Sequence, residues 1–180
     1  MRTADGDVTT ERIRAEALKL FVQRGYGNTT IEHISTAANV GVATIYRRWP
    51  DKAAIANQLY GAGVDSMLSI LDERPAEDDR AEFIALWGRA WEWANTNRNL
   101  FLFINASANA PWLTEENATR KAEASARELE TYARLKIDAT PDFAVALIGG
   151  TIGSVLMAEP DIDPDEVAER LWRALALGSG

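Results

Sequence analysis

The sequence has 180 residues, of which 47% are hydrophobic, 26% are charged and none is cysteine. This hydrophobic content is enough for a sizeable core, and the lack of cysteine excludes disulfides and thiolate metal sites. A single histidine excludes most nucleophile–base pairs and zinc sites, and no glycine-rich phosphate loop follows a strand. We therefore expect no enzyme, no cofactor and no bound metal. The first ten residues lack the apolar segment of a signal peptide, so we expect a cytoplasmic protein.

The net charge of −8 argues at first against a nucleic-acid partner, because phosphate binding needs Lys and Arg. The charge is unevenly distributed along the chain, however. Residues 1–52 hold eight Lys and Arg against six Asp and Glu, a net of +2, whereas residues 53–180 hold eleven against twenty-one, a net of −10. The small basic excess therefore lies in the N-terminal segment.

The first predicted helix runs from Thr10 to Arg24 and stops at Gly25. Thr29 lies three residues before Glu32, which is the spacing of a capping box, so a second helix is expected to begin just after Thr29. Asn39 should end it, because Asn tolerates the left-handed conformation of a sharp helix stop.

A third, short helix is expected from Val42 to Arg48, with Gly41 as its N-cap. Pro50 disfavours helix at the residue before it, and Asp51 can then cap a long helix that runs to about residue 73. Two short helices at a tight turn, followed by Tyr, two Arg and Lys, are typical of a helix-turn-helix that presents its second helix to DNA.

The segments Thr29-Thr30-Ile31, Ala38-Asn39-Val40, Thr44-Ile45-Tyr46 and Trp49-Pro50-x-Lys52, together with Ile34, resemble the DNA-binding signature of the TetR family of transcriptional regulators. The resemblance covers roughly residues 9–56. Asn39 and Trp49 stand where the family usually has Gly and Phe. Neither departure breaks the pattern, because Asn can adopt the same backbone conformation and Trp is a larger aromatic plug for the same core position.

Seven residues are expected to contact DNA: Thr30, Ala43, Thr44, Tyr46, Arg47, Arg48 and Lys52. The resemblance implies that Tyr46 and Lys52 contact phosphates. Arg47 is expected to read guanine, because its guanidinium fork matches O6 and N7, whereas Arg48 is expected to touch only phosphate. For each arginine, a solvated surface charge remains the alternative.

Every strong periodicity after residue 52 is helical, with further helices expected at about 79–97, 98–108, 114–137, 141–158 and 164–177. No strand pattern of useful length and no internal repeat occurs. We therefore expect an all-α fold with a three-helix head over residues 1–52 and a helical ligand-binding and dimerisation body over residues 53–180.

The middle third is rich in aromatic residues, and ligand pockets are mostly apolar and aromatic with few polar groups. We predict a small-molecule effector site formed by Phe83, Trp87, Trp91, Phe101, Phe103, Asn105 and Trp112. The alternative for each ring is that it only packs the core. Glu92 is expected to be solvated.

The segment from Asp142 to Ala158 is apolar on all sides, so it should be buried on more than one side. Its length touches the lower limit for a membrane span, but its three glycines and acidic flank favour a core or interface helix. The last two helices resemble the pair that dimerises TetR-type proteins through a four-helix bundle. We predict a homodimer interface formed by Ala146, Gly150, Gly153, Met157, Leu171 and Leu175; an ordinary intrachain hairpin is the alternative.

Together these patterns predict a ligand-responsive repressor that binds a pseudo-palindromic operator as a homodimer and does not enter a membrane. A small apolar or aromatic effector would release it from DNA by moving the long helix that begins near Asp51. The alternative is a helical small-molecule-binding or adaptor protein with a vestigial DNA-binding head.

Overall fold

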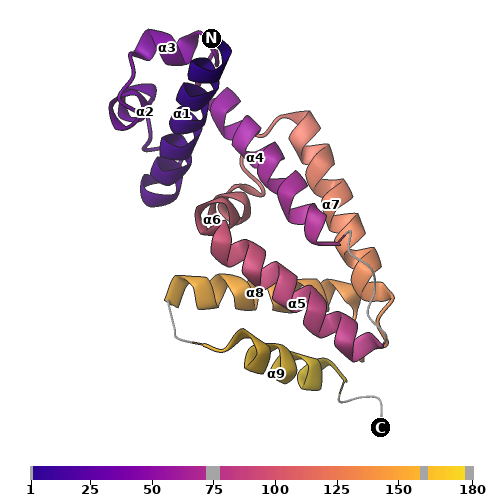
Figure 1. The fold of residues 1–180 in the computed structure, drawn as a ribbon. Helices are drawn as coiled ribbons and strands as arrows, with labels where there is room; N and C mark the ends of the chain where they lie inside the picture. The colour runs from indigo at the N-terminus through magenta and orange to yellow at the C-terminus, as the bar shows by residue number, and fades with distance from the viewer. Residues whose placement is uncertain (1, 72–77, 159–161, 177–180) are drawn as a thin grey trace. The chain divides into compact units, whose positions relative to one another are not determined.

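The computed structural model describes residues 2–71, 78–158 and 162–176, with side chains from residue 8 onward. All regular structure in these ranges is helical (Figure 1), which confirms the expected all-α fold. The helices are α1 (Arg2–Arg24), α2 (Ile31–Ala37), α3 (Val42–Tyr46), α4 (Lys52–Leu68), the short 3-10 helix η1 (Ser69–Leu71), α5 (Asp79–Thr96), α6 (Arg98–Ser107), α7 (Glu115–Ala133), α8 (Pro141–Ala158) and α9 (Pro164–Ala176).

The chain forms two compact units, which we call the head unit (residues 1–63 and 99–118) and the body unit (residues 64–98 and 119–180). This division differs from the boundary expected at residues 52 and 53. The head unit joins the helix-turn-helix to most of α4, nearly all of α6 and the beginning of α7. Sequence periodicity identified these helices but carried no information about which unit they join.

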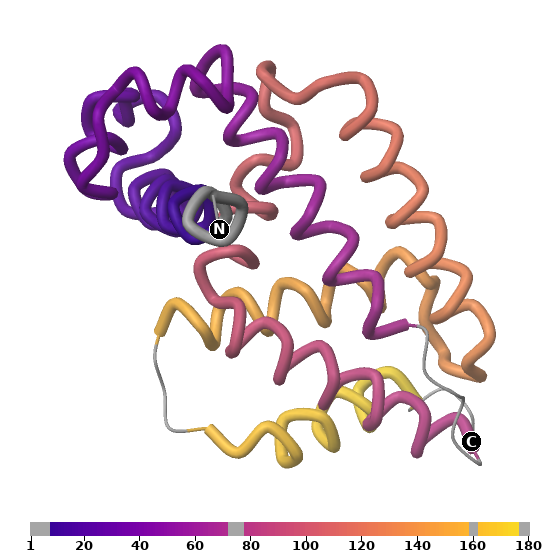
Figure 2. The backbone as a smooth tube through the Cα atoms, turned by 45° about the horizontal axis from the view of Figure 1, so that its top comes forward, coloured from indigo at the N-terminus to yellow at the C-terminus, as the bar shows by residue number. Residues whose placement is uncertain are grey.

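The head unit is built around the apolar stripe of α1. Its buried members are Ile13, Ala17, Leu20 and Phe21, and the inner faces of α2 and α3 contribute Ile31, Ile34 and Ile45. In both Figure 1 and Figure 2, α1 lies together with α2 and α3. Trp49 closes this core with only 6% of its surface exposed, and its indole N–H donates to Gln58 Oε1 at 2.9 Å. The aromatic plug expected at this position is therefore present.

The helix ends of the head follow from a few local signals. Gly25 has φ +79°, which is the left-handed region that favours glycine, and it ends α1 as expected. Asn39 has φ +50° and ends α2 in the same way. Asp51 caps α4, because its Oδ1 accepts a hydrogen bond from Ala54 N at 2.8 Å.

The N-cap of α2 is Thr30, so the expected capping box at Thr29 and Glu32 is one residue out of register. Thr30 Oγ1 accepts a hydrogen bond from His33 N, and His33 Nδ1 accepts one from Thr30 N, both at 3.3 Å. Thr29 is fully buried instead, and its hydroxyl donates to Gly25 O at 2.9 Å. The hydroxyl of Thr29 therefore binds the end of α1, which leaves the next threonine to begin α2.

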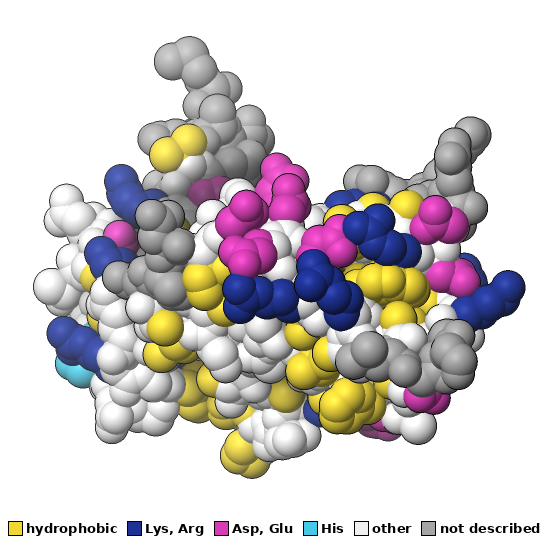
Figure 3. Space-filling model, turned by 90° about the horizontal axis from the view of Figure 1, so that it is seen from below, with side chains coloured by type: hydrophobic (Ala, Val, Ile, Leu, Met, Phe, Trp, Pro, Cys, Tyr) yellow, Lys and Arg dark blue, Asp and Glu magenta, His cyan; other side chains and the backbone are white. Residues whose placement is uncertain are grey.

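In the body unit, α5 packs against α8 and α9 (Figures 1 and 2). Phe83 meets Trp172 of α9 with ring centroids 5.5 Å apart, and the indole N–H of Trp87 donates to Pro164 O at 2.9 Å. An ion pair between Arg80 and Glu169 joins the same two helices. On the face seen in Figure 3, Lys and Arg side chains lie among Asp and Glu, with hydrophobic side chains exposed between them.

Within the single chain, α8 is buried on one face only, through Ala144, Ile148, Ile152 and Leu156. Burial on more than one side was expected, so this expectation is wrong for the isolated chain. By length and composition α8 is apolar enough to cross a membrane, with a mean hydropathy of 1.5, yet only 22% of it is buried. The remaining apolar face lacks a partner within the described part of the chain.

Candidate nucleic-acid interface

The turn between α2 and α3 is held by hydrogen bonds between its own residues. Val40 N donates to Ser35 O at 3.0 Å, and the Ser35 hydroxyl donates to Val40 O at 2.7 Å. Gly41 then provides an extended N-cap, with φ −69° and ψ 143°, and Thr44 N donates to its carbonyl at 2.8 Å. These bonds fix the direction in which α3 leaves the turn.

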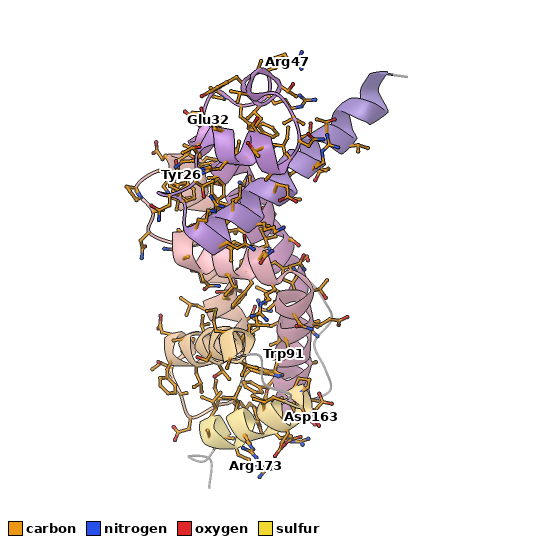
Figure 4. The ribbon with its side chains drawn as sticks, turned by 90° about the vertical axis from the view of Figure 1, so that its left-hand side faces the viewer. Tyr26, Glu32, Arg47, Trp91, Asp163 and Arg173 are labelled. Carbon is orange, nitrogen blue, oxygen red and sulfur yellow. The ribbon has the colours of Figure 1, made fainter. Side chains whose placement is uncertain are left out.

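One face of α3 is fixed in the core and the other is exposed. Ile45 is completely buried, whereas Tyr46 is 51% exposed, and Ala43 and Arg47 are also exposed. Figure 4 shows Arg47 projecting outward from α3. Its Nη2 donates to Thr44 Oγ1 at 3.1 Å, so the arginine and the threonine expected to contact DNA lie side by side.

Arg48 is held within the head unit. Its Nε donates to Thr10 Oγ1 of α1 at 2.8 Å, and its Nη1 donates to Thr44 O at 3.0 Å. Half-buried, it fastens the end of α3 to α1. This contact of Thr10 was not predicted, because a contact across 38 residues leaves no local signal.

At the start of α2, Thr30 is exposed and serves as the helix cap. Glu32 lies in the first turn, where hydrogen bonds from its own backbone N–H and from the Thr30 side chain lower the pKa of its carboxyl. His33, to which the sequence assigned no role, completes the capping box.

Lys52, at the first residue of α4, is bound to the turn between α1 and α2. Its ammonium donates to Tyr26 O at 2.6 Å and to Thr29 O at 2.7 Å, and it lies 4.1 Å from the centroid of the Tyr26 ring. Partial burial lowers the pKa of Lys52. Burial, followed by the negative charge of Asp51, raises the pKa of the Tyr26 hydroxyl.

All seven residues expected to contact DNA therefore lie in the head unit, on α2, α3, the end of α3 and the start of α4. Of these residues, Thr30, Ala43, Tyr46 and Arg47 are exposed. Arg48 and Lys52 already bind carbonyl or hydroxyl oxygens of the protein, so the head itself fixes their positions.

The seven residues predicted for an effector site are divided between the two units. Phe83, Trp87 and Trp91 belong to the body unit, whereas Phe101, Phe103, Asn105 and Trp112 belong to the head unit. A groove of about 310 Å³ in the body unit is lined by other residues: Ser69, Ile70, Arg89, Glu92, Trp93, Thr96 and Asn97. Glu92 is exposed, as expected, but it lines this groove. The ligand roles of the seven residues stay predictions.

The residues predicted for a dimer interface divide into two groups. Ala146, Gly150 and Met157 are exposed and Gly153 is half-buried, on the side of α8 opposite its buried face. On α9, Leu171 is half-buried, but Leu175 is only 1% exposed and its carbonyl accepts a hydrogen bond from Asp138 N at 2.8 Å. Leu175 lies in the core of its own subunit, and we remove it from the predicted interface.

Comparison with known proteins supports the DNA-binding interpretation of the head. Residues 13–59 match the family model described as bacterial regulatory proteins of the tetR family. The HTH-type transcriptional regulator TcmR of Streptomyces glaucescens is 34% identical over 71 residues, which are 39% of this chain and 31% of that protein. The uncharacterized HTH-type transcriptional regulator YvkB of Bacillus subtilis is 35% identical over 65 residues, 36% of this chain and 34% of that protein. The matched segment thus spans about a third of these relatives.

Solved structures resemble the fold over nearly the whole chain. A bacterial regulatory protein of the tetR family from Rhodococcus RHA1 has a TM-score of 0.78 at 18% identity, covering 93% of this chain and 97% of that one. A TetR family transcription regulator from Marinobacter aquaeolei VT8 has a TM-score of 0.74 at 18% identity, covering 98% of this chain and 99% of that one. The expectation that the chain is not an enzyme agrees with a family of regulators. The helix-turn-helix signature and these sequence matches identify residues 13–59 as a DNA-binding segment of the tetR type, and the fold of nearly the whole chain is that of the solved TetR-family structures.

Proposed function

We propose that this chain is a DNA-binding transcriptional repressor that works as a homodimer and leaves its operator when an effector binds. The observation that carries the proposal is the exposed face of α3. Ile45 anchors that helix in the core, while Ala43, Tyr46 and Arg47 face outward. A short helix held in this way has the shape of a recognition helix that enters the major groove.

The side chains on α3 suit the chemistry of base edges and phosphates. Arg47 offers a planar fork of donors that matches guanine O6 and N7, and its bond to Thr44 limits the directions it can take. The methyl group of Ala43 suits thymine C5. Tyr46 offers a hydroxyl to phosphate, and Thr30 at the cap of α2 is proposed as a further phosphate contact, for which its hydroxyl would turn from the Glu32 carboxylate to the DNA.

Lys52 is proposed to place a positive charge near the DNA backbone. Two protein carbonyls and the Tyr26 ring hold its ammonium, so Lys52 would contribute a positive charge fixed at the start of α4. The net charge is +2 over residues 1–52 and −10 over the remainder, so residues 1–52 repel phosphates less than the rest of the chain does.

The homodimer is proposed to form through the open side of α8. A small-residue stripe of Ala146, Gly150 and Gly153, with Met157, lies opposite the buried face. Small side chains allow a second helix to approach closely, and an apolar face that water would otherwise contact gains free energy when it is covered. A second copy of the chain presents the same stripe, as a twofold axis requires.

The conformational change that releases the DNA is proposed to be transmitted along α4. This helix belongs to the head unit as far as Gly63 and to the body unit from Val64. An effector that binds better to the DNA-incompetent conformation would shift the population of the dimer away from the operator. The proposed effector is small and apolar or aromatic.

A gel-shift experiment with genomic DNA flanking the gene tests the proposal, repeated at about 50 and 200 mM salt. We expect retardation of a specific fragment that survives excess competitor DNA and weakens steeply at the higher salt concentration. The Arg47→Ala variant should lose preference for that fragment. Equal retardation of all fragments, or none, would favour the adaptor alternative with a vestigial head.

A further inference from the structure

The contacts of Trp112 in the head unit differ from those expected of a ligand-pocket residue. Trp112 follows α6, and its ring stacks on Tyr26 with centroids 4.6 Å apart. It also contacts Phe103 of α6 at 5.9 Å, Phe103 contacts Phe21 of α1 at 5.5 Å, and Phe21 contacts Tyr26 at 5.6 Å. The four rings therefore form a closed cycle that joins α1, the turn before α2, α6 and the segment after α6.

The backbone around Trp112 is tied to α4 by Asn57. Asn57 Nδ2 donates to Trp112 O at 2.9 Å, and Asn57 Oδ1 accepts from Thr114 N at 2.9 Å. Asn117, only 3% exposed, donates to both Asn57 O and Asn57 Oδ1 at 2.9 Å. These bonds hold residues 112–117 against Asn57, which lies on α4 five residues after Lys52.

A second close approach holds α6 itself against α4. A Cβ atom added to Gly63 would lie 2.6 Å from Ile104 Cδ1 and 2.9 Å from Leu100 Cδ1 of α6. Any larger residue here would require Ile104 and Leu100 to shift, so α6 and the first part of α4 pack closely. The segment that carries Phe103 and Trp112 therefore has two attachments to α4.

These contacts close a circuit. Lys52 binds the carbonyls of Tyr26 and Thr29, the Tyr26 ring stacks on Trp112, and the Trp112 carbonyl accepts from Asn57, which returns to α4. Tyr26 and Thr29 lie just before α2, the first helix of the helix-turn-helix. The circuit therefore fixes the start of α2 relative to the start of α4.

We infer that Trp112 and Asn57 are positioning residues for DNA binding, which act through Tyr26 and Lys52 although neither lies on the proposed DNA-contacting surface. The inference rests on the proposed function and adds to it. Loss of the Trp112 ring frees the Tyr26 ring, and the ammonium of Lys52 then loses one of its partners. The phosphate contact proposed for Lys52 and the placement of α2 are lost together.

The test is a double-mutant cycle on the full-length chain, with Trp112→Leu, Lys52→Gln and the two combined. The probe is the tightest duplex that the wild-type chain selects from a random-sequence library. Each single variant should weaken binding about tenfold, and the double variant also only about tenfold, because residues that act as one unit are not additive. A loss of about a hundredfold in the double variant would overturn the inference, since independent effects multiply.

Three further variants separate positioning from general damage. Trp112→Phe keeps a flat ring for Tyr26 and should bind within about threefold of wild type, because offset stacking needs only a ring face. Trp93→Leu makes the same truncation in the body unit and should leave binding unchanged. If Trp112→Leu does not fold by circular dichroism, Asn57→Ala, which leaves the ring stack in place, replaces it in the cycle.

Amide hydrogen exchange gives a readout that needs no DNA. In Trp112→Leu, exchange should become about tenfold faster over residues 26–31 and 52–57, because these backbone groups lose a support. Unchanged exchange over these residues would overturn the inference even if DNA affinity fell. Should the wild-type chain select no sequence, the proposed function fails, while the exchange result still decides whether the circuit exists.

Discussion

Replacing Gly150 with leucine separates the stability of the subunit from that of the dimer. Gly150 is exposed on α8, and a Cβ atom added there meets no other atom within 4 Å. The subunit therefore has room for the new side chain. Leucine also has a higher helix propensity than glycine, so we expect the folded subunit to gain about 0.5 to 1 kcal/mol.

The dimer should respond in the opposite direction. Extra side-chain volume in a well-packed contact costs about 1 to 3 kcal/mol, and a twofold axis introduces it twice. The dimer of Gly150→Leu should thus be weaker by about 2 to 6 kcal/mol. Since about 1.4 kcal/mol is a factor of ten, the dissociation constant should rise at least about 30-fold.

Sedimentation velocity over a dilution series measures the dimer constant, and thermal unfolding at low protein concentration measures the subunit. Gly149→Leu is the matched control, because Gly149 is also exposed with open space around it but points about 100° away around the helix. It should change dimerisation much less. The proposed interface is refuted if Gly150→Leu dimerises like the wild type, or if both variants weaken the dimer equally.

Three further predictions concern single side chains. Arg47→Ala should lose about 1 to 3 kcal/mol of operator affinity and relax specificity at one base position, with Arg134→Ala as a control of equal charge; uniform loss over all sequences would place Arg47 on phosphate. Thr29→Val should lower the free energy of unfolding by about 1 to 3 kcal/mol in urea titrations, because the Gly25 carbonyl loses its donor; an unchanged midpoint would contradict this. Burial raises the pKa of Glu128, so folded-state stability is lost as pH rises through that pKa. Glu128→Gln should therefore raise Tm at pH 7, with a gain that disappears on acidification; a gain independent of pH would show another cause.

The helices were predictable because their signals are local. Gly25, Asn39 and Asp51 act through their own backbone conformation or through an amide three residues away, and the structure has each of them where expected. The cap of α2 was misplaced by one residue for a physical reason. Both Thr29 and Thr30 suit an N-cap, and only the buried carbonyls of Leu20 and Gly25 decide that Thr29 turns inward.

The partners of each helix face were not predictable from periodicity. A 3.6-residue pattern shows that Phe103 faces inward, but the ring it meets is Phe21 of α1, 82 positions away along the chain. The same limit explains Leu175, which packs inside its own subunit. Contacts over long sequence separations set these outcomes.

Selection of duplexes from a random-sequence library by the wild-type chain tests the central claim most directly. If two copies of α3 read DNA, the enriched sequences should form an inverted repeat, with half-site centres about 10 base pairs apart or a multiple of that distance. Guanine should recur at one position in each half-site, and Arg47→Ala should remove that preference alone. Enrichment of a single half-site would contradict the dimer, and no enrichment over random sequence would contradict the account of α3 as a recognition helix.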